Sequence, residues 1–280
     1  MVLSLNDAGE AVKALQRDLN KLGALLNIDG HFGEGTQTAV GDARAALAQP
    51  GPATIADDAL IAALASAPDP FAAVTAPGAT FIARAEVTSA KAYRATYRFP
   101  TWPSATSGIT IGIGYDLQFV TPAQLRADWA GVLAEPALAR LSVVTQVVGS
   151  DARLGAVRDI DVPLTGAMSV FARRSLPAYL TDVRKIYPQV DALSPARQTA
   201  LVSLVYNRGA RLTDKDPAAQ DRREMRAIRD LLAANDLDAV AGQFESMTRL
   251  WDPQKLGGLI QRRRDEATLW RAGFAPLQLV

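Results

Sequence analysis

The spacing of apolar residues predicts a short helical segment at the N-terminus of the chain. Leucine and valine recur at intervals of three and four over residues 7–22, and charged residues occupy the rest of the helical wheel, which is typical of an amphipathic helix. Gly23 is expected to end this helix, and Thr36 is a suitable N-cap for a second one. A third helical run lies at 56–66. The pattern therefore predicts a three-helix domain over residues 1–66.

The next part of the chain is expected to contain a linker and a short β element. Residues 67–78 are rich in proline and alanine, which is the composition of a linker. After them the pattern predicts a helix over 80–91 and a strand or turn over 93–99. Isoleucine or tyrosine stands at every second position from Ile109 to Tyr115, which is typical of a strand.

The remainder of the chain is almost wholly helical in pattern. Helices are expected to begin near Thr121, Thr165, Ser194, Asp221, Asp236 and Pro253. The sequence therefore predicts a mostly α (α+β) fold with two domains. The first is the three-helix domain, and the second, residues 79–280, combines a short β-ribbon with many helices.

Two residue counts exclude several kinds of active site. The chain has no cysteine and therefore no disulfide, thiolate zinc site or cysteine nucleophile. Its single histidine, His31, cannot form a multi-histidine zinc site, so we expect neither a metal nor another cofactor. His31 is expected to be a loop residue. Acid–base chemistry in this protein would therefore use carboxylates.

Charge is unevenly distributed, although the formal net charge is only +1. Residues 1–75 hold four Lys and Arg against nine Asp and Glu, whereas the rest of the chain holds 26 against 20. The mildly basic larger part suits an anionic polymer. Its bases alternate with acids and aromatic residues are few, so nucleic acid is not the expected partner. No run of about 18 apolar residues predicts insertion into a membrane.

The N-terminal helices resemble the type 1 peptidoglycan-binding domain. The pattern of that family is a helix with Gly-x-x-Val-x-x-Leu-Gln, then Asp-Gly-x-Phe-Gly, then Thr-x-x-Ala-Val. The matching residues here are Gly9, Val12, Leu15, Gln16, Leu19, Leu22, Gly23, Asp29, Gly30, Phe32, Gly33, Thr36, Ala39 and Val40. Most of these positions are also suited to the core and turns of a three-helix bundle. The resemblance covers about residues 5–66 and implies binding to peptidoglycan.

Glu86 is the candidate catalytic acid of the larger domain. It is the only carboxylate between Asp69 and Asp116, and it follows Phe81 and Ile82 in the predicted helix. A glycosidase needs one carboxyl group that is protonated at working pH, and apolar neighbours favour the neutral form. The alternative is a solvated charge on a helix surface.

Five segments extend this argument along the larger domain. They are Phe-Ile-x-x-x-Glu at 81–86, Tyr93, Thr-Ile-Gly-Ile-Gly at 110–114, the helix end at 200–209 and the arginine-rich segment at 258–270. In this order they resemble the phage-type lysozymes of glycoside hydrolase family 24 and, more closely, the lysozyme-like domain of pesticin. The resemblance implies a muramidase domain.

The second catalytic group departs from the phage pattern. Phage-type lysozymes place an aspartate nine residues after the glutamate, where this chain has Ala95. The pesticin-like pattern places it six residues after the threonine, and Asp116 stands there. By resemblance, Glu86, Thr110 and Asp116 carry the chemistry.

The spacing of Thr110 and Asp116 requires a bend in the backbone. A straight strand would separate them by roughly 20 Å, too far to serve one sugar bond. Gly112 and Gly114 lie between them and would permit the bend. The two residues have the same strand parity, so their side chains are expected on one face unless a bulge intervenes.

The resemblance implies hydrolysis of the β-1,4 bond between N-acetylmuramic acid and N-acetylglucosamine. Glu86 would protonate the leaving oxygen, while Thr110 and Asp116 would position or activate a water on the opposite face, with inversion. Carboxyl groups about 6.5 to 9.5 Å apart favour inversion, and a separation of about 5 to 5.5 Å favours retention.

Two alternative functions stay open. One is a lytic transglycosylase, which would leave a 1,6-anhydro ring. The other is a wall-binding protein without activity, as the alanine at 95 allows.

Four further residues are candidates for substrate binding. They are Tyr93, Tyr115, Asn207 and Trp102. The two tyrosines are equally suited to packing, and Asn207 is equally suited to a helix end before a glycine cap. Trp102 lies in a proline-rich loop, and the other tryptophans are expected in the core.

The arginine run Arg262–Arg264 matches a segment of the resemblance. Because Asp265 and Glu266 follow it directly, it is interpreted as a charged, solvated helix face.

The expected partners follow from the muramidase hypothesis. Glycan strands of peptidoglycan are the expected substrate, and a monomer is the expected state. The first residues lack a basic segment, an apolar core and an Ala-x-Ala site, so no signal peptide is expected. The protein would then reach the periplasm or cell wall by holin-dependent release, as a phage endolysin, or through a secretion system, as an antibacterial effector with an immunity or delivery protein.

Overall fold

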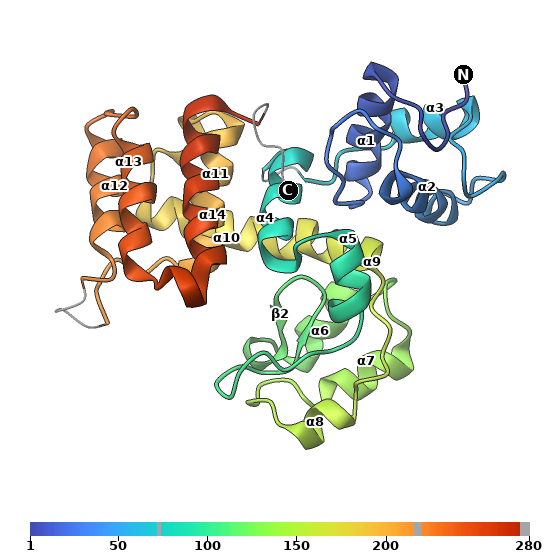
Figure 1. The fold of residues 1–280 in the computed structure, drawn as a ribbon. Helices are drawn as coiled ribbons and strands as arrows, with labels where there is room; N and C mark the ends of the chain where they lie inside the picture. The colour runs from blue at the N-terminus through green and yellow to red at the C-terminus, as the bar shows by residue number, and fades with distance from the viewer. Residues whose placement is uncertain (72–73, 216–219, 275–280) are drawn as a thin grey trace. The chain divides into compact units, whose positions relative to one another are not determined.

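The computed structural model describes residues 1–71, 74–215 and 220–274. Helices dominate these ranges, and their paired strands form one two-stranded antiparallel sheet (Figure 1). The predicted mostly α (α+β) fold is therefore confirmed. None of the helices in these ranges is both long enough and apolar enough to cross a membrane.

Two compact units are formed, and each takes residues from two segments. The first comprises Met1–Ala72 and Ala83–Ser175, and the second comprises Ala73–Ile82 and Leu176–Val280. Helix α4 (Thr75–Val87) contributes residues to both.

The predicted linker, 67–78, overlaps this helix. Residues 75–78 are helical, and residues 72–73 lie outside the described residues. The domain boundaries at 1–66 and 79–280 remain a prediction.

The three predicted N-terminal helices are present. Helix α1 spans Glu10–Lys21, α2 spans Glu34–Ala46 and α3 spans Asp58–Ser66. Gly23, with φ +81°, follows α1 as expected, and its N–H donates to the Asn20 carbonyl (3.0 Å). The inward faces form one apolar core, which contains Leu3, Val12, Leu15, Leu19, Phe32, Ala39, Val40, Ala43, Ala56, Leu60 and Leu64.

The predicted capping role of Thr36 is wrong. Helix α2 begins two residues earlier, with Gly33 at the N-cap, and Thr36 is buried. The Gln16 amide donates both to the Thr36 hydroxyl (3.3 Å) and to the Asp29 carboxylate (2.8 Å). These hydrogen bonds join α1 to the following loop and to α2. The capping preferences of residues near Thr36 do not predict such a contact with a distant residue. His31 is an exposed loop residue, as predicted.

The segment after α4 is helical, so the strand or turn predicted over 93–99 is wrong. Helix α5 (Ala90–Ala92) continues into a π-helical turn, η1 (Tyr93–Tyr97). The Ser89 hydroxyl caps α5 by accepting from the Ala92 N–H (3.1 Å). At the other end, the Arg98 N–H donates to the Tyr93 carbonyl (2.8 Å), which is the wider spacing of a π-turn.

The rest of the first unit combines the sheet with short helices. These are β1 (Thr110–Ile111), β2 (Tyr115–Asp116), the 3₁₀ turn η2 (Leu117–Phe119), α6 (Pro122–Trp129), α7 (Glu135–Ser142), α8 (Asp151–Gly155), α9 (Leu164–Val170) and the π-turn η3 (Phe171–Ser175). The predicted start of α6 is confirmed, because the Thr121 hydroxyl accepts from the Gln124 N–H (3.1 Å).

The second unit is a bundle of helices in which α14 packs against α11 and α13 (Figure 1). The predicted starts near Ser194 and Pro253 are confirmed, whereas α13 begins four residues after Asp236. The elements are α10 (Leu176–Ile186), η4 (Val190–Ala192), α11 (Pro195–Arg208), α12 (Arg223–Ala233), α13 (Val240–Ser246), η5 (Met247–Leu250) and α14 (Pro253–Ala272).

Candidate active site

A tight hairpin brings two of the predicted catalytic residues together. Strands β1 and β2 pair antiparallel, with Thr110 opposite Asp116. Gly112 and Gly114 lie in the turn with φ +59° and +66°, a left-handed conformation that glycine adopts without strain. The bend predicted from the glycines is confirmed.

Thr110 and Asp116 face each other directly across the sheet. The N–H and C=O of Thr110 both bond to Thr101 (2.8 and 2.9 Å), and the Leu117 N–H donates to the Ile109 carbonyl (2.9 Å). This pattern makes Thr110 and Asp116 a non-hydrogen-bonded pair, in which the side chains share a face and the Cβ atoms lie about 4.5–5.5 Å apart. The predicted shared face is confirmed for this pair.

Backbone N–H groups hold the Asp116 carboxylate in one orientation. Its Oδ1 accepts from the Gly108 N–H (3.1 Å) and from the Gln118 N–H (2.9 Å), and the second bond caps η2. The side chain is half-buried. Because a carboxylate accepts about four hydrogen bonds, further lone pairs remain for a water or a sugar hydroxyl.

The hairpin is fixed to α6 through Tyr115. The tyrosine hydroxyl donates to Asp128 (2.8 Å), a buried carboxylate that also pairs with Arg174 (2.7 Å). The Tyr115 ring meets Trp129 edge to face, with centroids 5.5 Å apart. Burial and the Asp128 hydrogen bond raise the pKa of the Tyr115 hydroxyl. In this structure Tyr115 supports the hairpin, and its substrate-binding role stays a prediction.

Glu86 lies in the last turn of α4, and its part of that helix belongs to the same compact unit as the hairpin. Its side chain is half-buried, and the adjacent Val87 is buried. Two residues after Glu86, Thr88 has φ +64°, which is rare for a β-branched residue. Strained backbone of this kind clusters at functional sites, so it favours a functional role for this helix end.

Two of the predicted substrate-binding residues, Tyr93 and Trp102, are packed against other parts of the protein. Tyr93 is fully buried, its hydroxyl donates to the Val162 carbonyl (2.9 Å), and burial raises its pKa. Trp102 is half-buried against Gly149, where an added Cβ would lie 2.4 Å from the indole ring. Tyr93 therefore packs in the core, and the predicted substrate contacts of both residues remain predictions.

Asn207 belongs to the second unit and stands near the end of α11. Gly209 follows as the C-cap with φ +73°, and its N–H donates to the Val205 carbonyl (2.7 Å). Asn207 therefore stands at a helix end, as the alternative interpretation expected, and its substrate-binding role stays a prediction.

The interpretation of Arg262–Arg264 as a solvated helix face is wrong for two of the three arginines. Arg262 and Arg263 are buried, and Arg264 is exposed. Glu266, also buried, accepts from Arg263 (2.7 Å), and the Arg262 guanidinium reaches Ser203 on α11 (Nε to Oγ, 3.1 Å). The hydrogen bond from Arg262 to Ser203 and the ion pair with Glu266 offset part of the desolvation cost of burying these charges. Trp129 and Trp270 are core residues, as expected, whereas Trp251 is only half-buried.

Sequence reasoning missed Gly108, which cradles the Asp116 carboxylate. A Cβ at this position would lie 2.3 Å from Asp116 Oδ1 and 2.6 Å from the Gln118 nitrogen. We expect Gly108→Ala to displace the carboxylate and to lower the free energy of unfolding by about 1–3 kcal/mol, measured by chemical denaturation.

The matched control for this substitution is Gly155→Ala in α8. There a new Cβ meets only the tip of the flexible Arg158 side chain, at 3.5 Å. This variant is expected to keep the wild-type stability to within about 0.5 kcal/mol. Equal effects of the two substitutions would contradict the role assigned to Gly108.

Comparison with known proteins bears on the N-terminal helices. Residues 8–46 match the family model described as putative peptidoglycan binding domain. No curated protein matches the whole chain or a part of it significantly. The matched range contains α1, α2 and the loop that Gln16 holds between them. The chain therefore carries a peptidoglycan-binding domain at its N-terminus, which indicates a function related to the cell wall.

Proposed function

We propose that the protein is a muramidase that hydrolyses the β-1,4 bond between N-acetylmuramic acid and N-acetylglucosamine in peptidoglycan. The observation that carries the proposal is the hairpin, in which Thr110 stands opposite a carboxylate held by two backbone N–H groups. Glu86 supplies a second carboxyl group from the same compact unit. The peptidoglycan-binding domain supports the wall glycan as substrate.

The proposed reaction divides the proton transfers between two carboxyl groups. Glu86 donates its proton to the glycosidic oxygen as the bond to the anomeric carbon breaks. A water held by Thr110 and Asp116 adds its oxygen to the opposite face of that carbon and gives a proton to Asp116. The configuration at the anomeric carbon is thereby inverted, and exchange with solvent restores both carboxyl groups.

The N-terminal domain serves this reaction by tethering. A domain that holds the chain on the sacculus raises the local concentration of glycan around the catalytic groups. Its benefit is therefore expected to be largest on intact walls and smallest on soluble fragments. Either an endolysin or an antibacterial effector would use such an arrangement.

Purified sacculi provide the test of the proposed reaction. The protein is expected to lower the turbidity of a sacculus suspension and to release muropeptides that carry one added water per cleaved bond, measured by mass spectrometry. Products that end in a 1,6-anhydro ring would overturn hydrolysis and identify a lytic transglycosylase. Binding to sacculi without any released product would overturn catalysis and identify a wall-binding protein.

A further inference from the structure

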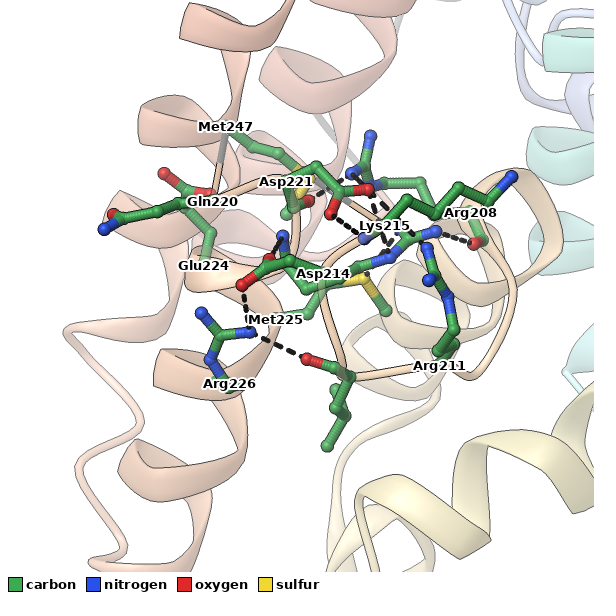
Figure 2. A network of polar contacts seen from close by, with 12 residues as sticks. Arg208, Arg211, Asp214, Lys215, Gln220, Asp221, Glu224, Met225, Arg226 and Met247 are labelled. Carbon is green, nitrogen blue, oxygen red and sulfur yellow. Dashed lines mark hydrogen bonds and ion pairs between the residues drawn. The ribbon is translucent and has the colours of Figure 1, made fainter. Parts of the chain in front are cut away.

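The second unit contains a group of arginines that exceeds its carboxylates in charge. It lies between the end of α11 and the first turn of α12, in a different unit from the residues proposed for catalysis. We name it the arginine cluster, and its members are Arg208, Arg211, Arg222, Arg226, Asp214 and Asp221. Figure 2 labels all of them except Arg222. Four guanidinium groups against two carboxylates leave an excess of two positive charges.

One carboxylate oxygen faces three of these guanidinium groups at once. Asp221 Oδ2 lies 4.0 Å from Arg208, 3.7 Å from Arg211 and 3.6 Å from Arg222. All three distances exceed those of a hydrogen bond. Asp221 therefore contributes negative charge at this position but forms no hydrogen bond with any of the three guanidinium groups through this oxygen.

Buried donors in the cluster lack an acceptor as a result. Among the residues that the structure describes, the Nε atoms of Arg208 and Arg222 and the Nη2 atom of Arg211 are buried and have no hydrogen-bond partner. The side chains of Arg208 and Arg222 are only 10% and 9% exposed. An unsatisfied buried donor on a charged group costs free energy that a suitable acceptor would recover.

Backbone carbonyls, rather than carboxylates, fix two of the three guanidinium groups. Arg208 Nη2 donates to the Asp221 carbonyl, and Arg222 Nη2 donates to the Arg208 carbonyl (2.8 Å). The Arg208 guanidinium also stacks over Trp251, 5.2 Å from the ring centroid. Arg208 and Arg222 are therefore held in place before any anion arrives, which lowers the entropic cost of binding one.

The other carboxylate of the cluster is already occupied. Asp214 accepts from the Arg222 backbone N–H (2.7 Å) and from Arg226 (3.0 Å). Burial, with the neighbouring Arg222 charge, lowers the pKa of Arg208 to about 10. Within the described residues of the cluster, the like charges are thus incompletely neutralised.

We propose that the arginine cluster binds a phosphate-type oxyanion, and that Asp221 occupies part of this position when the anion is absent. A carboxylate matches one guanidinium in a planar, two-point contact, whereas donors from three separate side chains suit a tetrahedral group with three or four oxygens. The anion is either free phosphate or the phosphate of a phosphodiester polymer of the wall. This inference does not depend on the proposed muramidase activity.

Titration calorimetry of the full-length protein with inorganic phosphate, at constant ionic strength, tests the proposal through two variants with opposite effects. Arg211→Gln removes the most exposed of the three donors and is expected to weaken phosphate binding about tenfold. Asp221→Asn removes the competing charge and is expected to tighten binding about threefold to tenfold. The matched control is Arg229→Gln, because Arg229 is paired with Asp230 on the surface of α12 and should leave the affinity unchanged.

Two titrants distinguish the sources of the anion. Tighter binding of poly(glycerol phosphate) than of inorganic phosphate would support the phosphodiester polymer, and the reverse order would support free phosphate. Absence of heat with both titrants up to about 50 mM phosphate groups, far above the range of specific binding, would overturn the proposal. Binding that Arg211→Gln and Asp221→Asn leave as it is in wild type would also overturn it, because the anion would then lie elsewhere.

Discussion

Replacement of Glu86 by glutamine is expected to lower the rate of glycan cleavage about 100- to 10,000-fold, the range that a general acid contributes. The amide keeps the size of the side chain and its hydrogen-bonding capacity, but it has no proton to give to the leaving oxygen. Glu86 is half-buried at the end of α4, so the fold should tolerate the change. The rate is measured as the initial fall in turbidity of a sacculus suspension, and folding is measured by circular dichroism.

The matched control for this experiment is Glu135→Gln at the start of α7. That carboxylate is exposed and pairs with Arg126 on the surface (3.0 Å), so its loss should leave the rate unchanged. A Glu86→Gln protein that clears sacculi at the wild-type rate would remove Glu86 from the mechanism. If both variants lose activity equally, the lower rate would result from the loss of one negative charge and not from the loss of a proton donor.

Helix starts were the part of the fold most open to prediction. Thr121 precedes Pro122, and Asp252 precedes Pro253, and in both cases a capping side chain followed by a proline at the first helical position is a signal contained in adjacent residues. The π-turn over Tyr93–Tyr97 has no such signal. It adds only one residue to each helical turn, so its sequence does not differ from that of a strand or loop.

The candidate site was predictable in its residues and only partly in its geometry. The glycines at 112 and 114 indicated a bend, and the hairpin register then set Thr110 opposite Asp116. The contact of Asp116 with the Gly108 N–H was not predictable. It depends on the path of the chain before β1, which no local pattern describes. The catalytic role of these residues remains the proposal tested above.

The burial of charged side chains was the feature of the fold that was hardest to predict from the sequence. Arg262 and Arg263 stand in a run of charged residues, and such a run is usually solvated. In the structure, Ser203 on α11, about 60 residues earlier in the chain, accepts from Arg262 and donates to Glu266. Only the packing of α14 against α11 supplies this partner, and that packing is a property of the fold.

Removal of the Glu266 charge is expected to give the largest loss of stability. The Glu266 carboxylate is fully buried and accepts from the Ser203 hydroxyl (2.6 Å) and from Arg263 (2.7 Å). Burial raises the pKa of Glu266, and the charges of Arg263 and Arg262 oppose this shift. Both guanidinium groups lie within ion-pair distance of the carboxylate, at 2.7 and 3.5 Å. Glu266→Gln would leave two buried guanidinium groups without their counter-charge.

The expected cost of Glu266→Gln is about 3–5 kcal/mol in the free energy of unfolding. It is measured by denaturant unfolding followed by tryptophan fluorescence, because Trp251 lies beside Arg263. Ser203→Ala removes two hydrogen bonds, the one to Glu266 and the one from Arg262, and leaves the charges paired. It should therefore cost less, about 1–3 kcal/mol.

The control for Glu266→Gln is Glu245→Gln in the same unit. Glu245 pairs with Arg271 on the surface, where an ion pair contributes less than about 1 kcal/mol. The same chemical change therefore has a large cost in the buried network and a small cost at the surface. A loss of stability for Glu266→Gln no larger than that for Glu245→Gln would mean that Arg262 and Arg263 do not need the carboxylate, and that water or a rearranged helix α14 compensates their charge.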